Sequence, residues 1–126
     1  MKIRKVLAVV MAATVIGVFA MQSSAGSIHY NCSNHTYLGN DTNPASSWRY
    51  LHVNNSYSSG KCGVYLSVEN SSGSTVYGRK LFPYATTISD LVVSVPGNAK
   101  RYFWVEPGQS SHSVSGHYNY SFSTSS

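Results

Sequence analysis

Charged residues are scarce in this chain of 126 residues, of which only 10% are Asp, Glu, Lys or Arg. Four of them are acidic: Asp41, Glu69, Asp90 and Glu106. Glycosidase-type catalysis needs two carboxylates that face each other across the bond to be cleaved. Asp90 and Glu106 stand at opposite ends of two successive strand-like segments and could meet at a sheet edge, but solubilising residues at strand ends give the same pattern. We therefore place a secreted hydrolase third among the functions considered and lean towards a protein that is not an enzyme.

Metal-ligand spacing is absent as well. The histidines are His29, His35, His52, His112 and His117, and they form no HxH, HExxH or Cys-His grouping. A structural zinc site needs four ligands, usually at recognisable spacings. We predict no metal and no cofactor, and we assign the histidines to the surface or to the segment that covers the sheet.

Basic clusters are missing once the start of the chain is set aside. Of the nine Lys and Arg residues, Lys2, Arg4 and Lys5 precede an apolar run, which leaves six basic residues against four acids in residues 26–126. A nucleic-acid-binding protein gathers Lys and Arg on one face. The sequence therefore predicts no nucleic-acid partner.

Only one long apolar run occurs, at residues 6–20. It is shorter than the roughly 20 residues that a membrane-spanning helix needs. It follows a basic start and precedes Ser23-Ser24-Ala25, which places small residues where a secretory signal peptide is cut. We expect residues 1–25 to be a cleaved signal peptide, and the mature chain to be secreted, extracellular or periplasmic, with no membrane span.

Cysteine is limited to Cys32 and Cys62. In an exported chain an even number of cysteines favours a disulfide. Closing a loop of about 30 residues would stabilise the fold by roughly 3 to 4 kcal/mol on the chain-entropy model. A pair of free thiols with redox or nucleophilic chemistry is the alternative.

The sequence does contain a repeated period of two, and no segment after residue 25 has a sustained helical period. Alternating or β-favouring residues separated by Gly, Pro, Asn and Ser turns predict strands. The six segments are 48–53, 64–69, 75–82, 91–95, 101–105 and 113–122. Shorter strands are possible at 28–31 and 36–38, and loops are expected at 38–44 and 54–60. The fold class is therefore all-β: one small antiparallel β-sandwich, or a barrel-like variant of it.

Residues 91–105 are the strongest signal. Two β-favouring arms flank Pro96-Gly97-Asn98, where Pro96 and Gly97 can form the centre of a type II turn. We predict a hairpin here. Residues 75–82 carry Arg79 and Lys80, and charge of this kind is typical of an edge strand.

Three segments result from these predictions. Residues 1–25 are the signal peptide, and residues 26–47 are a polar segment tethered by the disulfide, which covers the sheet or forms its edge. Residues 48–126 are the sandwich core of the same single domain.

Aromatic residues are abundant: ten tyrosines and two tryptophans all follow residue 25. If the aliphatic residues of each strand face the core, several rings face the other way, and Tyr and Trp suit ligand platforms and interfaces. The candidate ligand-binding residues are Trp48, Tyr50, Tyr65, Tyr102 and Trp104. The alternative is that the N-terminal segment buries these rings, or that tyrosines simply populate strands.

The leading hypothesis is a secreted, non-catalytic β-sandwich that binds a glycan, a cell-wall or other envelope polymer, or another protein through these rings. The second is a small secreted toxin, antimicrobial or enzyme inhibitor, which small size, export and net positive charge would suit.

Overall fold

The computed structural model describes residues 25–70, 76–84 and 89–126, which form eight β-strands and no helix. The signal peptide prediction concerns residues outside this description, apart from Ala25. So do most of the turn expected at 70–73 and the first residue of the strand expected at 75–82. The strands are β2 (Ala25–Cys32), β3 (Thr36–Thr42), β4 (Arg49–Ser59), β5 (Val64–Glu69), β6 (Val76–Phe82), β7 (Leu91–Val95), β8 (Lys100–Pro107) and β9 (Val114–Ser123).

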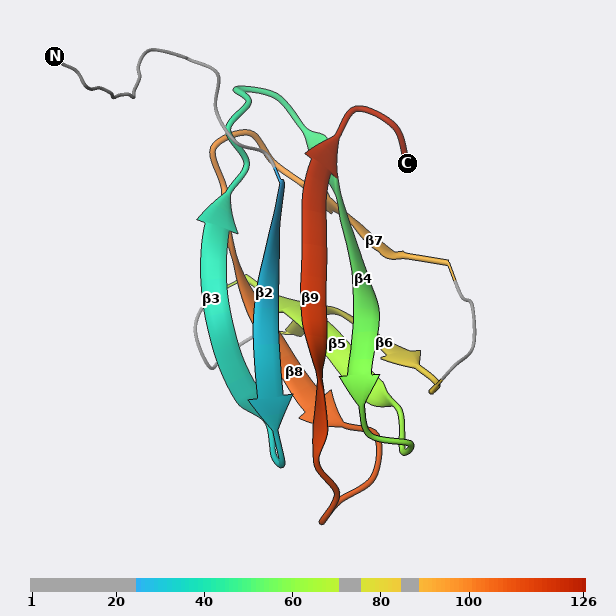
Figure 1. Ribbon diagram of the computed structural model, residues 1–126. Coiled ribbons are helices and arrows are strands. Elements are labelled where there is room, and N and C mark those ends of the chain that lie inside the picture. The colour runs from blue at the N-terminus through green and yellow to red at the C-terminus, as the bar shows by residue number, and fades with distance from the viewer. Residues whose placement is uncertain (1–24, 71–75, 85–88) are drawn as a thin grey trace, which may run out of the picture.

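The strands form two four-stranded antiparallel sheets (Figure 1). Sheet 1 has the order β2-β9-β4-β7, and sheet 2 has the order β3-β8-β5-β6. Figure 1 shows β2, β9 and β4 in front of β5 and β8. The all-β sandwich is therefore confirmed, and the charged strand β6 lies at an edge as expected.

Side-chain alternation explains where the core lies, because every second residue of a strand points to the same face. In β4, β5 and β8 the aliphatic or aromatic residues of one parity are fully buried between the sheets. The largest fully buried side chains of the described residues are Tyr118 on β9 and Phe103 on β8, whose ring centroids are 5.2 Å apart. The Tyr118 hydroxyl donates to the carbonyl of Ser67 at 2.9 Å, so its one polar group is satisfied. Burial raises the pKa of this phenol well above its ordinary value.

The predicted hairpin at 91–105 is wrong in its pairing. β7 pairs with β4 in sheet 1, whereas β8 pairs with β3 and β5 in sheet 2. The chain does turn between the two arms, where the amide of Ala99 donates to the carbonyl of Pro96 at 3.2 Å. The positive φ falls on Asn98, at 63°, and not on Gly97. The turn is thus a crossover between sheets.

Asn43 explains why this crossover is held in place. Its side chain is completely buried and donates to the carbonyls of Ser47, Val95 and Pro96, each at 3.1 Å. Gly97 is required beside it, because a Cβ there would lie 2.3 Å from the backbone of Ser46. The loop before β4 and the crossover are therefore fixed to one another.

Two predicted loops are strands in the structure. β3 continues through the Gly-Asn-Asp segment to Thr42, with a bulge between Tyr37 and Gly39. β4 continues through 54–59, where it pairs with β9. Residues 26–47 consequently supply the edge strand β2 to sheet 1 and the edge strand β3 to sheet 2.

The prediction of a disulfide is wrong: Cys32 and Cys62 are both free cysteines in the structure. Cys32 is buried at the end of β2, whereas Cys62 is only partly buried. The Cys62 thiol donates to the carbonyl of Gly63 at 3.3 Å and so is turned towards its own loop. Burial, with the nearby Cys62 and Glu106 charges, raises the pKa of the Cys32 thiol to about 11.

Candidate functional site

The outer face of sheet 2 carries most of the ring stacking on the surface. Alternation turns the even-numbered residues of β8 and the odd-numbered residues of β5 outwards. The strand register then places Tyr37 opposite Trp104, and Tyr65 opposite Glu106. We call the following set the aromatic face: His35, Tyr37, Tyr65, Glu69, Arg79, Tyr102, Trp104 and Glu106.

Three rings lie together at the β3 side of this face. The ring centroid of Tyr37 is 5.2 Å from that of Trp104 and 6.2 Å from that of Tyr102. The amide of Asn40 donates to the Tyr37 hydroxyl at 2.6 Å and fixes the end of that ring. Tyr37 nevertheless stays 40% exposed. A ligand can therefore reach an oriented ring on this face.

His35 covers the next part of the face. Its imidazole stacks on Trp104 with ring centroids 4.4 Å apart and planes 15° from parallel. Its Nε2 lies 3.6 Å from Oε2 of Glu69, and its Nδ1 lies 3.6 Å from Oε1 of Glu106. The imidazole is thus held between two carboxylates above an indole, while 45% of the side chain remains exposed.

Arg79 completes the charged part of the face. Its Nη2 lies 3.1 Å from Oε1 of Glu106, and its guanidinium carbon is 3.7 Å from the ring centroid of Tyr65. A cation over an aromatic ring is attracted by the negative face of the ring. Arg79 therefore pairs with Glu106 and covers Tyr65.

Two buried polar atoms on the aromatic face have no hydrogen-bond partner. They are Oε1 of Glu69, a residue only 4% exposed, and Nε1 of Trp104. A buried polar group without a partner costs about 1 to 3 kcal/mol. One is an acceptor and the other a donor, so each lacks the hydrogen bond that buried polar groups normally make.

The structure separates the five residues predicted to bind a ligand. Tyr65, Tyr102 and Trp104 belong to the aromatic face of sheet 2. Tyr50 lies on β4 in sheet 1, and Trp48, 61% exposed, directly precedes that strand. Alternation correctly gave the outward direction of the rings but could not assign strands to sheets.

Sequence reasoning missed His35, Tyr37 and Arg79 as members of this face. Tyr37 lies in a segment for which only a short strand at 36–38 was considered, and Arg79 was interpreted only as charge typical of an edge strand. For His35 the sequence carries no local signal, because its position depends on where the link between β2 and β3 passes. The prediction of surface histidines is consistent with its exposure.

The outer face of sheet 1 is chemically different, and we call it the amide–hydroxyl face. It carries Ser27, His29, His52, Asn54, Ser56, Ser59, Asp90, Ser115, His117 and Asn119. Asp90 lies 3.3 Å from Nδ1 of His52 and accepts from the Asn54 amide at 3.1 Å. Because Asp90 is beside sheet 1 and Glu106 is on sheet 2, the two acids do not form the carboxylate pair considered above.

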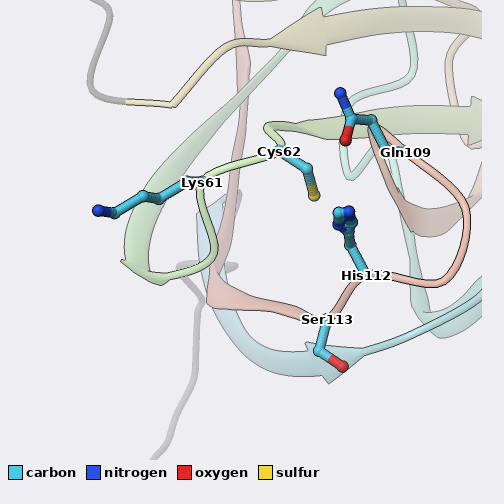
Figure 2. A pocket seen from close by; sticks show the side chains of 5 residues that line it. All are labelled: Lys61, Cys62, Gln109, His112 and Ser113. Atoms are coloured by element: carbon cyan, nitrogen blue, oxygen red, sulfur yellow. The ribbon is translucent and has the colours of Figure 1, made fainter.

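A pocket of about 300 Å³ opens at one end of the sandwich (Figure 2). It is lined by Lys61, Cys62, Gln109, His112 and Ser113. Figure 2 shows the Cys62 sulfur pointing towards the His112 ring, while Lys61 points away. Among the residues that the structure describes, no group of three or more His, Cys, Asp or Glu side chains could hold a metal ion.

Within residues 25–70, 76–84 and 89–126, no helix has the length and apolar character needed to cross a bilayer. Comparison of the chain with protein-family models, with curated proteins and with solved structures finds no match. The site must therefore be interpreted from its own geometry.

Proposed function

We propose that this chain is an exported, non-catalytic binding protein that holds a glycan of an extracellular or cell-envelope polymer on the aromatic face of sheet 2. The observation that carries the proposal is the group of Tyr37, Tyr102 and Trp104, side by side on two paired strands. Flat rings with an apolar body and a polar tip suit the alternating CH and OH groups of a sugar ring.

Rigidity supports this proposal. The rings project from β3 and β8, and β8 is paired on both sides. A site on paired strands is better fixed than one on a loop, so less side-chain ordering remains to be done when the ligand binds. The exposed Trp48 is instead on the segment before β4, away from this group.

The test is a comparison of two exposed tyrosines. The full chain is expressed, recovered after export and incubated with insoluble chitin, chitosan, cellulose and peptidoglycan. We expect Tyr37→Ala to weaken binding to the preferred polymer by about tenfold or more, as for a central interface aromatic residue. Tyr84→Ala is the matched control, since Tyr84 is 41% exposed and Tyr37 40%; it should bind as the wild type does.

Two results would contradict the proposal. One is that none of the polymers retains the wild-type protein. The other is that Tyr50→Ala or Trp48→Ala abolishes binding while Tyr37→Ala leaves it unchanged, which would place the ligand on sheet 1. A far-ultraviolet circular dichroism spectrum of each variant shows whether the fold is kept.

A further inference from the structure

His35 occupies a position that a cationic ligand group could fill. Below it is the flat face of Trp104, and beside its two ring nitrogens are Glu69 and Glu106, each at 3.6 Å. An aromatic face combined with carboxylates is a favourable environment for an ammonium group. We call Trp104, Glu69 and Glu106 the cradle.

We propose that the cradle binds a protonated amino group of the glycan, and that His35 is an internal occupant which this amine displaces. The inference rests on the proposed function, because it assigns the chemistry of one position on the same aromatic face. It adds that the preferred polymer contains amino sugars whose nitrogen is free and charged.

The balance of charge in the cradle supports a cation. Arg79 already pairs with Glu106 at 3.1 Å. Oε2 of Glu69 lies 3.6 Å from the His35 imidazole, and its other oxygen, Oε1, is buried without a partner. An ammonium group carries three donors and can bond both oxygens of one carboxylate. An anionic ligand would instead be repelled by the negative charge of the buried Glu69 carboxylate.

The position of the cradle favours a glycan over an extended peptide. A peptide that adds to a sheet needs the free backbone groups of an edge strand. Glu69 is on β5 and Trp104 and Glu106 are on β8, and these are the two central strands of sheet 2. Only side chains are available there, and Tyr37 and Tyr102 lie next to Trp104 for the neighbouring sugar rings.

The experiment uses two probes that share one backbone. Glucosamine oligosaccharides carry free amines, whereas N-acetylglucosamine oligosaccharides of the same length carry neutral amides. Titration calorimetry is run in dilute buffer at a pH below the pKa of the sugar amine. We expect the wild type to bind the amine probe about tenfold or more tightly than the acetylated probe, and added salt to reduce this preference.

Variants separate the cradle from the ring platform. Glu69→Gln should remove the preference for the amine probe while retaining binding to the acetylated one. Tyr37→Ala should weaken the binding of both probes. His35→Ala should tighten binding of the amine probe several-fold, because the internal competitor is gone; a merely structural role for His35 would weaken binding instead.

Failures of the two proposals can be told apart. Equal affinity for both probes, with loss of both in Tyr37→Ala, would leave the binding function standing and overturn the cradle. Weaker amine binding in His35→Ala would also overturn the role of His35 as occupant. If neither probe nor any insoluble polymer binds, the proposed function itself is contradicted.

Discussion

The two outer faces of the sandwich differ in how fully their polar atoms are paired. On the amide–hydroxyl face, Asn119 accepts from Ser27 at 2.7 Å and donates to Asn54 at 3.1 Å and Ser56 at 2.9 Å. On the aromatic face, Glu69 Oε1 and Trp104 Nε1 are buried without partners. The other unpartnered buried side-chain atoms of the described residues belong to Asn55 and Arg101, at inward-facing positions of β4 and β8.

This difference shows which face has more to gain from a ligand. A polar group that already has a protein partner must exchange that bond when a ligand binds, so its net gain is small. A buried group without a partner recovers its lost hydrogen bond on binding. Two faces built on the same core therefore differ: the amide–hydroxyl face is paired within its own network, whereas the aromatic face keeps unpaired buried polar atoms, which supports the proposed binding function.

The largest effect on stability should come from a change on the amide–hydroxyl face. Asn119→Ala removes three side-chain hydrogen bonds, so we expect the free energy of unfolding to fall by about 1 to 2 kcal/mol. Urea denaturation measures the change, with Asn31→Ala on neighbouring β2 as the control at an exposed amide. An unchanged denaturation midpoint would show that the network adds nothing to stability, and the contrast between the faces would then lose its basis.

A smaller effect on stability is expected from a change on the aromatic face. Glu69→Gln should leave the free energy of unfolding within about 1 kcal/mol of the wild type, because loss of the contact with His35 is offset by removal of a poorly solvated carboxylate. Chemical denaturation at neutral pH measures it, beside the binding data for the same variant. A loss of several kcal/mol would identify Glu69 as a structural residue and contradict a role in binding.

The third prediction concerns the reactivity of the two thiols. At pH 8, Cys62 should react with iodoacetamide about tenfold or more faster than Cys32, because a thiol must be accessible and ionised to react. Peptide mass spectrometry after timed quenching gives both rates. Equal rates would show that the end of β2 opens readily.

The raised pKa of the Cys32 thiol predicts that the folded state loses stability at alkaline pH. The folded pKa of Cys32, about 11, is above the ordinary 9.0, so the unfolded chain releases its proton first as the pH rises. Between those values the folded state binds more protons, and its stability therefore falls with increasing pH. Cys32→Ser should reduce this alkaline loss.

The sequence predicted local features well because they depend on neighbouring residues. The period of two in residues 64–69 and 113–122 correctly gave both β5 and most of β9, including their buried faces. The segment 54–59 was missed because Asn and Ser usually bond to nearby backbone. Here the side chains of Asn54 and Ser56 bond to Asn119 on the adjacent strand, and tertiary pairing outweighs local preference.

The candidate site was less predictable because it depends on how strands are distributed between the sheets. The turn at Pro96 was identified, but no local feature states that its two arms enter different sheets. Tyr65 and Trp104 could be assigned an outward direction, whereas Trp48 could not be separated from them. Prediction of the cradle requires the full strand register, since Glu69 and His35 are 34 positions apart in the chain.

The link that carries His35 also has a mechanical consequence. Only residues 33–35 connect β2, at the edge of one sheet, to β3, at the edge of the other. A tether of that length has little slack, so any sliding between the two layers would drag the imidazole across the indole beneath it. Strain applied to the sandwich would thus move the imidazole away from, or back towards, the Glu69 carboxylate beside it.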